Sequence, residues 1–276
     1  MYINRFSRTK ASRKNAKIIF LLIVLIPASA LLIWWLRDSN QSNSIQSSPT
    51  QSGQKKTADK TKEKLFNKNL YSVNDPTSLW AVVNKGRVLP NDYVPAGLRQ
   101  PSGGDSNQSL RNDAATALEK LFNDALPSGY DLVLYSGYRS YSLQVGVYNG
   151  FVKSQGQQMA EKFSARPGHS EHQTGLAADV SSITGKCTLE QCFAYTSEGK
   201  WLAANAYKYG FIIRYQSGRQ NLTGYEYEPW HLRYVGTELA AEINRTDQTL
   251  EQFFELPTYK LDAPYPDNSY QLRTGL

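Results

Sequence analysis

The sequence predicts an α+β fold: a compact single domain over residues 66–276, in which a small, mostly antiparallel sheet is flanked by helices. Segments with helical and with extended character follow one another without the regular alternation that builds a parallel sheet, which favours this class. A run of nineteen uncharged residues, 18–36, indicates a transmembrane helix before the domain. A polar stretch, 37–65, has little to bury and predicts a disordered linker between the two.

The N-terminal segment has the pattern of a membrane anchor. Residues 1–17 carry six Lys/Arg and lead directly into Ile18–Leu36. At about 1.5 Å per residue this run covers the roughly 30 Å hydrocarbon core, and the basic block predicts that residues 1–17 stay in the cytoplasm. We therefore expect a single-pass protein of the cell membrane whose domain is extracellular. Ala28-Ser29-Ala30 also has the form of a signal-peptide cleavage site, which would give a secreted domain, but the apolar run continues beyond Ala30.

Charge is divided unevenly along the chain. The overall charge of +7 comes from residues 1–65, which hold 12 Lys/Arg and 3 Asp/Glu, a net charge of +9. Residues 66–276 hold 19 Lys/Arg and 21 Asp/Glu, a net charge of −2. The domain therefore has no electrostatic reason to bind a nucleic acid, and we expect no such partner. We also expect a monomer.

The first part of the domain predicts a helix, a strand and a second helix. Apolar residues recur at helical spacing over Leu110–Leu126, and Pro127-Ser128-Gly129 ends that amphipathic helix. Leu132–Tyr135 then forms a short buried strand that runs into a glycine turn. Ser140 is placed to cap a helix that continues to about Val152.

The second part adds three strands and two helices. Gly175–Val180 alternates as a strand, with Leu176, Ala178 and Val180 on one face. A helix over residues 197–209 has a Ser or Thr cap and ends at Gly210, and the strand 211–215 follows. Residues 221–230 form a turn into a further strand, and the last substantial helix covers residues 236–244.

The two cysteines lie five positions apart, at Cys187 and Cys192. Outside a membrane, such a pair favours a disulfide that closes a small loop. Two free thiols remain an alternative, and a redox or zinc site is a weaker one, because two thiolates without further ligands are a poor metal signal.

Two of the three histidines, His169 and His172, stand beside the strand that ends in "GLAADV". On the Asp179 face of that strand the other residues are only glycine and alanine, which leaves space for a group bound next to the carboxylate. Gly175 allows the chain to bend, so that His172 can return over the same place.

The third histidine, His231, lies three positions after Glu228 in "YEYEPWHLRYVG". Pro229 cannot donate to a strand ladder, so we expect a bend that brings the Glu228 carboxylate to the His231 side. Two imidazoles and one carboxylate are the ligand set of a catalytic zinc with an open position for water, and Glu228 is suited to act as the base. Arg139, just after a strand, can stabilise a developing oxyanion or hold a substrate carboxylate. Taken singly, each residue also has a structural explanation: Asp179 could cap a turn and Glu228 could pair with Arg233.

Four motifs in order, "SGYRSYSLQ", "SARPGHSEHQTGLAADV", "EGKWLAANAYKYGFIIRY" and "TGYEYEPWHLRYVG", resemble the VanY-type D-alanyl-D-alanine carboxypeptidase family of zinc peptidases, which also contains peptidoglycan L,D-carboxypeptidases. The resemblance covers roughly Leu79 to Phe254. It implies Zn²⁺ as the cofactor, with His172, Asp179 and His231 as its ligands. It also implies Glu228 as catalytic base and acid and Arg139 as stabiliser of the transition state, with a substrate site lined by Gln144, Ser170 and Tyr215.

The activity implied by this resemblance is removal of the C-terminal D-alanine from peptidoglycan stem peptides by zinc-activated water. The bond is D-Ala-D-Ala in pentapeptides or L-Lys-D-Ala in tetrapeptides, and both remain open. The alternatives are an endopeptidase that cuts cross-links, a non-catalytic cell-wall binding module and a zinc-dependent signalling domain. The chain departs from the family pattern at "RYQSGRQ", where Gln216 replaces a proline and Arg219 a lysine, which bears on substrate preference. His169 is expected in the second shell or at the surface, because a fourth protein ligand would occupy the water position.

Overall fold

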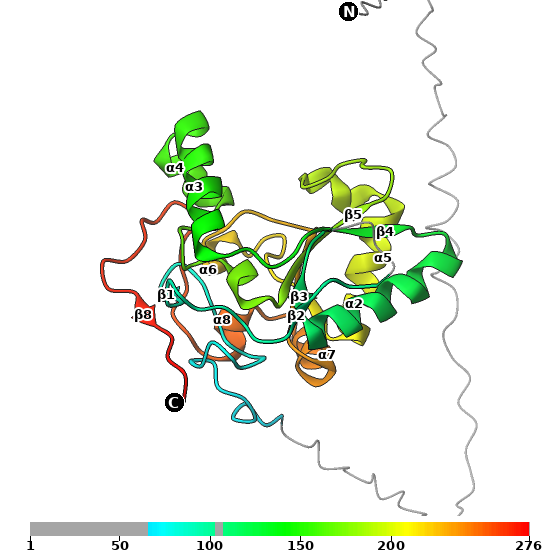
Figure 1. Ribbon diagram of the computed structural model, residues 1–276, viewed down its shortest axis with the longest axis horizontal. Coiled ribbons are helices and arrows are strands. Elements are labelled where there is room, and N and C mark those ends of the chain that lie inside the picture. Colours follow the sequence, from blue (N-terminus) through cyan, green and yellow to red (C-terminus); the bar gives the residue numbers. More distant parts are fainter. Residues whose placement is uncertain (1–65, 103–106, 276) are drawn as a thin grey trace, which may run out of the picture. The chain divides into compact units, whose positions relative to one another are not determined.

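A four-stranded antiparallel sheet lies at the centre of the computed structural model, which describes residues 66–102 and 107–275 (Figure 1). The strand order is β4 (Leu132–Ser136), β5 (Ala177–Ser182), β7 (His231–Tyr234) and β6 (Phe211–Ile213). Helices α2 (Asn112–Ala125) and α5 (Ser197–Asn205) contribute to one apolar core with this sheet. The predicted α+β class with an antiparallel sheet and flanking helices is therefore confirmed.

Two pairs of two-residue strands extend this architecture. Strand β2 (Leu98–Arg99) is antiparallel to β3 (Leu110–Arg111), and β1 (Arg87–Val88) is parallel to β8 (Tyr270–Gln271). The β1–β8 pair joins the end of the chain to the start of the domain, and Leu272 is fully buried beside it.

The remaining helices are α3 (Tyr141–Gln155), α4 (Gln157–Phe163), α6 (Gln220–Thr223), α7 (Thr237–Thr246) and α8 (Leu250–Phe253). Short 3₁₀ turns cover Leu126–Ser128, Glu171–Thr174, Gln191–Tyr195 and Ala206–Tyr209. Figure 1 shows α3 and α4 together, standing out from the rest of the domain. A second apolar cluster forms around Trp80, whose indole N–H donates to the Val235 carbonyl at 2.9 Å, and around the buried face of α7.

Several element boundaries differ from the predictions. The helix expected from Leu110 begins at Asn112, because Leu110 and Arg111 pair with β2. Helix α3 begins after the predicted cap, where the Ser140 hydroxyl accepts from the Leu143 N–H, but it continues to Gln155. Helix α4 was not predicted at all. Strand β5 lies two residues later than the expected 175–180, because Gly175 adopts the left-handed conformation that ends the preceding 3₁₀ turn.

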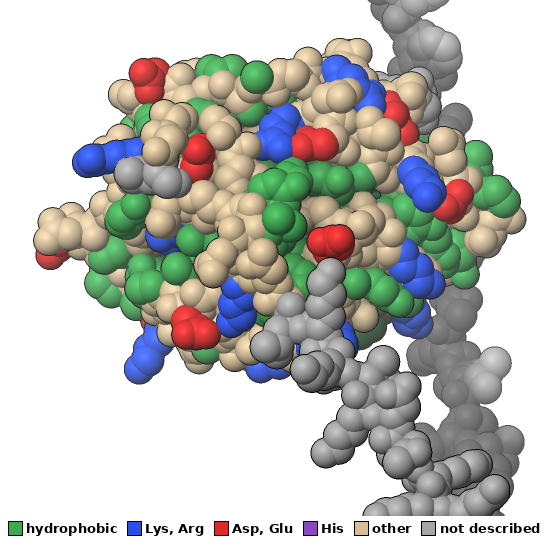
Figure 2. Space-filling model, turned by 90° about the horizontal axis from the view of Figure 1, so that it is seen from below, with side chains coloured by type: hydrophobic (Ala, Val, Ile, Leu, Met, Phe, Trp, Pro, Cys, Tyr) green, Lys and Arg blue, Asp and Glu red, His purple; other side chains and the backbone are tan. Residues whose placement is uncertain are grey.

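The predicted cytoplasmic segment 1–17, transmembrane helix 18–36 and linker 37–65 lie outside the described residues. Among residues 66–102 and 107–275, none of the helices combines the length and apolar character needed to cross a bilayer. On the face shown in Figure 2, acidic and basic side chains are interspersed and no histidine reaches the surface. This agrees with the burial of His169, His172 and His231.

Helix α5 packs closely against the turn before it at Gly199. A Cβ at this position would lie 1.9 Å from the Phe193 carbonyl oxygen, so Gly199→Ala must displace backbone. We expect a loss of about 1–3 kcal/mol or more in the free energy of unfolding, measured with urea. Gly150→Ala is the matched control, because it lies within α3 with no atom within 4 Å, and should raise stability by roughly 0.5–1 kcal/mol. Equal shifts in both variants would contradict the packing argument.

Candidate metal centre

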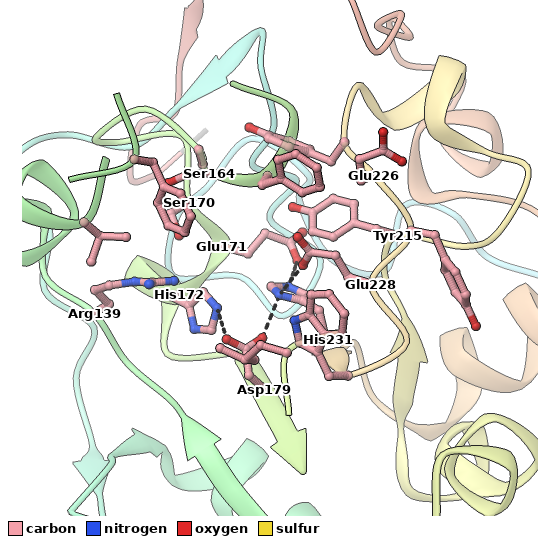
Figure 3. Close-up of a pocket in the computed structure, with 18 of the residues that line it drawn as sticks. Arg139, Ser164, Ser170, Glu171, His172, Asp179, Tyr215, Glu226, Glu228 and His231 are labelled. Atoms are coloured by element: carbon pink, nitrogen blue, oxygen red, sulfur yellow. Dashed lines mark hydrogen bonds and ion pairs between the residues drawn. The ribbon is translucent and has the colours of Figure 1, made fainter. Parts of the chain in front are cut away.

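The centre is built on two neighbouring strands and the turn beside them (Figure 3). In the antiparallel register of β5 and β7, Asp179 lies directly opposite His231. His172 is in the 3₁₀ turn Glu171–Thr174, and the left-handed Gly175 reverses the chain between this turn and β5. The register and the turn together bring His172, Asp179 and His231 to one place, with all three side chains buried.

The two imidazole rings present different nitrogens to the aspartate. His172 Nε2 lies 3.2 Å from Asp179 Oδ2, while its Nδ1 lies 2.7 Å from the Gly137 carbonyl oxygen. His231 Nδ1 lies 3.1 Å from Asp179 Oδ1, while its Nε2 lies 3.4 Å from Glu171 Oε2. Because the Gly137 carbonyl can only accept, His172 keeps its proton on Nδ1 and offers the Nε2 lone pair to the centre.

The donor set fits a zinc ion. One ligand atom from each of the three residues lies within 4.8 Å of the others, and the two Asp179 carboxylate oxygens lie 3.2 Å from His172 Nε2 and 3.1 Å from His231 Nδ1. A buried carboxylate between two ring nitrogens is costly unless a ring proton or a bound cation balances its charge. Two nitrogens and one carboxylate are the three protein ligands of catalytic zinc sites, which keep a fourth position open.

Burial and neighbouring charges shift the pKa values of these groups. Burial lowers the pKa of His172 and favours the neutral imidazole that a metal requires. For His231, burial acts in the same direction, but hydrogen bonds to Asp179 and Glu171 outweigh it and raise the pKa to about 9. Metal binding by His231 therefore releases a proton near neutral pH.

Glu228 stands beside His172, Asp179 and His231 without belonging to that group. The backbone turns at Pro229, with the His231 N–H donating to the Glu228 carbonyl at 3.1 Å, and one Glu228 carboxylate oxygen lies 3.6 Å from His231 Nδ1. The predicted bend towards the His231 side is thus present. Burial raises the pKa of Glu228 to about 8, which places it in the range of a group that exchanges protons at neutral pH.

A cavity of about 680 Å³ opens onto the centre. Its lining includes every other residue predicted for the site, namely Arg139, Gln144, Ser170 and Tyr215. The Arg139 Nε and the Gln144 Oε1 are buried in this wall without hydrogen-bond partners, although the Gln144 amide N–H donates to the Ala165 carbonyl. Polar side chains in a cavity wall are suited to orient a polar ligand such as a peptide terminus.

His169 is not part of the group. Its Nδ1 lies 2.9 Å from the Asn84 carbonyl oxygen and its ring packs edge-on against Tyr265. The side chain is buried, so the surface position considered for it is wrong.

Sequence reasoning missed three features of the site. Glu171 is fully buried and pairs with Arg214 and Arg233, so Arg233 is not the partner of Glu228 that was considered as an alternative. Glu226 lines the cavity two residues before Glu228. The loop between the cysteines lines it as well, through Leu189, Glu190 and Gln191. The clue for Glu171 was its place between Ser170 and His172, but its partners are distant in sequence.

Cys187 and Cys192 form a disulfide, as predicted, rather than two free thiols or a metal site. The bond closes the small loop that forms part of the cavity wall. The disulfide thus constrains residues that can touch a ligand.

Replacing both cysteines with serine should lower the free energy of unfolding by about 2 kcal/mol, because the open loop gains conformational entropy in the unfolded chain. The loop lines the cavity but not the metal group, so we expect KM to rise more than kcat falls. Urea unfolding and steady-state kinetics measure the two effects. Lys186→Ser, an exposed neighbour outside the ring, should change neither. A double variant that unfolds like the wild type would count against this role.

The comparison with known proteins identifies relatives over most of the domain. A family model described as VanY, D-alanyl-D-alanine carboxypeptidase, matches residues 107–237. The Bacillus subtilis protein YodJ is 44% identical over 192 residues, which cover 67% of this chain and 70% of that protein. A D-alanyl-D-alanine carboxypeptidase of Enterococcus faecium is 33% identical over 228 residues, which cover 79% of this chain and 67% of that protein.

Two solved structures show the same fold. The LdcB LD-carboxypeptidase superposes with a TM-score of 0.62 at 44% identity, covering 67% of this chain and 89% of that one. A mutant of the vancomycin-resistance D,D-pentapeptidase VanY, solved in complex with Zn(II), has a TM-score of 0.54 at 31% identity, covering 62% of this chain and 96% of that one. Together with the identity and coverage of the sequence relatives, these matches confirm the resemblance seen in the four motifs, and the chain belongs to the VanY family of D-alanyl-D-alanine carboxypeptidases.

Proposed function

We propose that this chain is a zinc-dependent carboxypeptidase that removes the C-terminal D-alanine from peptidoglycan stem peptides. The observation that carries the proposal is the convergence of His172, Asp179 and His231 at the wall of one cavity, with the Glu228 carboxylate 3.6 Å from His231 Nδ1. A non-catalytic binding module has no need for a buried carboxylate poised beside an open metal position.

His172 Nε2, His231 Nδ1 and a carboxylate oxygen of Asp179 would hold the metal. When bound, zinc supplies a Lewis acid that lowers the pKa of water from 15.7 to about 7. All three side chains line the cavity, so a metal held by them would be within reach of water and a substrate that enter it. The VanY relative in complex with Zn(II) supports this choice of metal.

Glu228 handles the proton of the reaction. Its carboxylate accepts a proton from the attacking water as the new C–O bond forms, and then delivers that proton to the departing amine as the C–N bond breaks. The products are a shortened peptide and free D-alanine, so atoms and charge balance. Arg139 lies at the same wall, where burial lowers its pKa without removing its charge, and it stabilises the oxyanion that develops on the carbonyl.

Substrate contacts come from the polar groups of the cavity wall. The side chains of Arg139, Gln144, Ser170 and Tyr215 line the cavity and can bind a short peptide end. Identity is higher to the LD-carboxypeptidase LdcB than to the D,D-pentapeptidase VanY, at 44% against 31%, which favours a tetrapeptide whose last bond is L-Lys-D-Ala.

Mass spectrometry of synthetic muropeptides tests the proposal. The full-length chain is incubated with a tetrapeptide ending in D-Ala and a pentapeptide ending in D-Ala-D-Ala, each with and without a zinc chelator. We expect chelator-sensitive loss of one alanine from the tetrapeptide. Loss from the pentapeptide alone would identify a D,D-carboxypeptidase, cleavage of a cross-linked dimer would indicate an endopeptidase, and no loss from any of these with zinc bound would overturn the proposal.

The N-terminal sequence supports a proposal for where this activity takes place. We propose that residues 18–36 anchor the chain as a single-pass membrane protein and that residues 37–65 hold the domain on the outer side, where its substrate is found. Protease added to intact cells should then remove the domain from the membrane fraction. Recovery of the domain in the culture medium would indicate cleavage near Ala30 instead.

A further inference from the structure

Glu171 is a buried carboxylate that touches a metal ligand but does not belong to the metal group. Its Oε1 accepts two hydrogen bonds, from Arg214 Nε at 2.8 Å and from Arg233 Nη1 at 2.9 Å. Its Oε2 lies 3.4 Å from His231 Nε2. Because both guanidinium groups bind the same oxygen, the other oxygen is free to face the imidazole.

The two arginines are themselves fixed. Arg214 donates to both carboxylate oxygens of Glu251, at 2.6 and 3.0 Å, and Arg233 donates to the Leu79 and Ala81 carbonyls, at 2.9 and 2.7 Å. The side chains of Glu171, Arg214, Arg233 and Glu251 are all fully buried. The two carboxylates and the two guanidinium groups have equal and opposite charges, so no ion in the cluster is left uncompensated. Their hydrogen bonds hold Glu171 in one orientation.

We propose that Glu171 is the positioning residue for His231. It holds the imidazole with the proton on Nε2, so that Nδ1, which faces Asp179, is left to bind the metal. This inference rests on the proposed zinc function. It gives His231 the same kind of support that the Gly137 carbonyl gives His172, with the roles of the two ring nitrogens exchanged. Metal-binding histidines commonly donate their second N–H to a carboxylate or a carbonyl, which fixes the tautomer and the ring orientation.

Glu171→Gln keeps the volume of the side chain but changes its hydrogen-bonding groups, so it distinguishes a positioning role from a packing role. Its carbonyl oxygen must take the place of Oε1, because the guanidinium groups of Arg214 and Arg233 can only donate. Its NH₂ group then faces His231 Nε2, and two donors meet unless the histidine moves its proton to Nδ1. In that tautomer Nδ1 has no lone pair for a metal, so Glu171→Gln should weaken zinc binding.

The test compares Glu171→Gln with Glu251→Gln in the full-length chain. Both substitutions remove one buried carboxylate from the same Arg214 cluster, but the Glu251 bonds go to Arg214 and Asn84, not to a metal ligand. Zinc Kd is measured by competition with a chelating indicator, and urea unfolding is measured on the metal-free proteins. We expect both variants to lose stability. Zinc Kd should weaken roughly 10- to 100-fold in Glu171→Gln and clearly less in Glu251→Gln, because Arg233 still binds Glu171 Oε1 there.

Each outcome bears on a separate point. A wild-type Kd in Glu171→Gln, or equal weakening in the two variants, overturns the positioning role. If Glu171→Gln does not fold, Glu171→Asp is measured instead, since it keeps the charge for the arginines but withdraws the carboxylate from His231; a wild-type Kd in that variant overturns the role equally. Failure of the wild-type chain to bind zinc would overturn the proposed function itself.

Discussion

Replacing Glu228 with glutamine is expected to lower kcat by roughly 10²- to 10⁴-fold while zinc affinity stays near that of the wild type. The amide keeps the volume of the side chain but cannot accept the proton of the attacking water or return it to the leaving amine. Glu228 lies 3.6 Å from His231 Nδ1 and is not one of the three residues that we propose as metal ligands. Loss of turnover with retained zinc therefore separates proton transfer from metal binding.

Glu226 provides the matched control for this experiment. It lies two residues before Glu228 on the same segment and lines the same cavity, and its backbone N–H is held by the Lys162 carbonyl at 3.0 Å. Glu226→Gln makes the same change from carboxylate to amide at the same wall, but it leaves Glu228 in place beside His231. We therefore expect less than about a tenfold change in kcat. Muropeptide kinetics and a zinc titration of both variants are the measurements. Near-normal turnover in Glu228→Gln, or an equal loss in Glu226→Gln, would rule out Glu228 as the proton carrier.

Local signals in the sequence were sufficient for most helices of the domain. The spacing of Leu118 and Leu121, the Ser140 cap and the Gly210 stop each depend on contacts within one turn, and the structure has them where they were expected. Helix α4 was missed because it has only seven residues and lacks a side-chain cap. The residue before it is Gly156, which has a positive φ. Pairings such as β1 with β8 join residues more than 180 positions apart, which no local pattern can reveal.

In the site, too, local relations between residues could be predicted, whereas long-range ones could not. Asp179 and His172 could be related from the strand alternation and the Gly175 turn, because both are local. The pairing of Asp179 with His231 depends on the register between β5 and β7, which the sequence does not display. Only the family resemblance joined the two segments. Neither the local patterns nor the family resemblance indicated the role of Glu171. Its burial depends on Arg214 and Arg233, which lie 43 and 62 positions after it in the chain.

Replacing Asp179 with asparagine should abolish zinc-dependent activity, and this is the second large effect that we expect. The amide is neutral, so the two imidazoles lose the only anionic ligand of the group. We expect zinc Kd to weaken on the order of 100-fold or more, above the range typical of residues that act through a ligand. The change also has a readout without substrate. At free zinc of 100 times the wild-type Kd, binding stabilises the folded wild-type chain by about 2.7 kcal/mol.

Urea unfolding with zinc and with chelator therefore distinguishes a lost ligand from a damaged fold. Wild-type protein should show the full zinc-dependent gain, whereas Asp179→Asn should show less than about 0.5 kcal/mol, because at 100-fold weaker binding the same zinc concentration only equals its Kd. Asp131→Asn is the control, since this exposed residue directly precedes β4 and lies outside the metal group. It should keep the full gain. A full gain in Asp179→Asn would mean that zinc binds without Asp179 and that the ligand set is different.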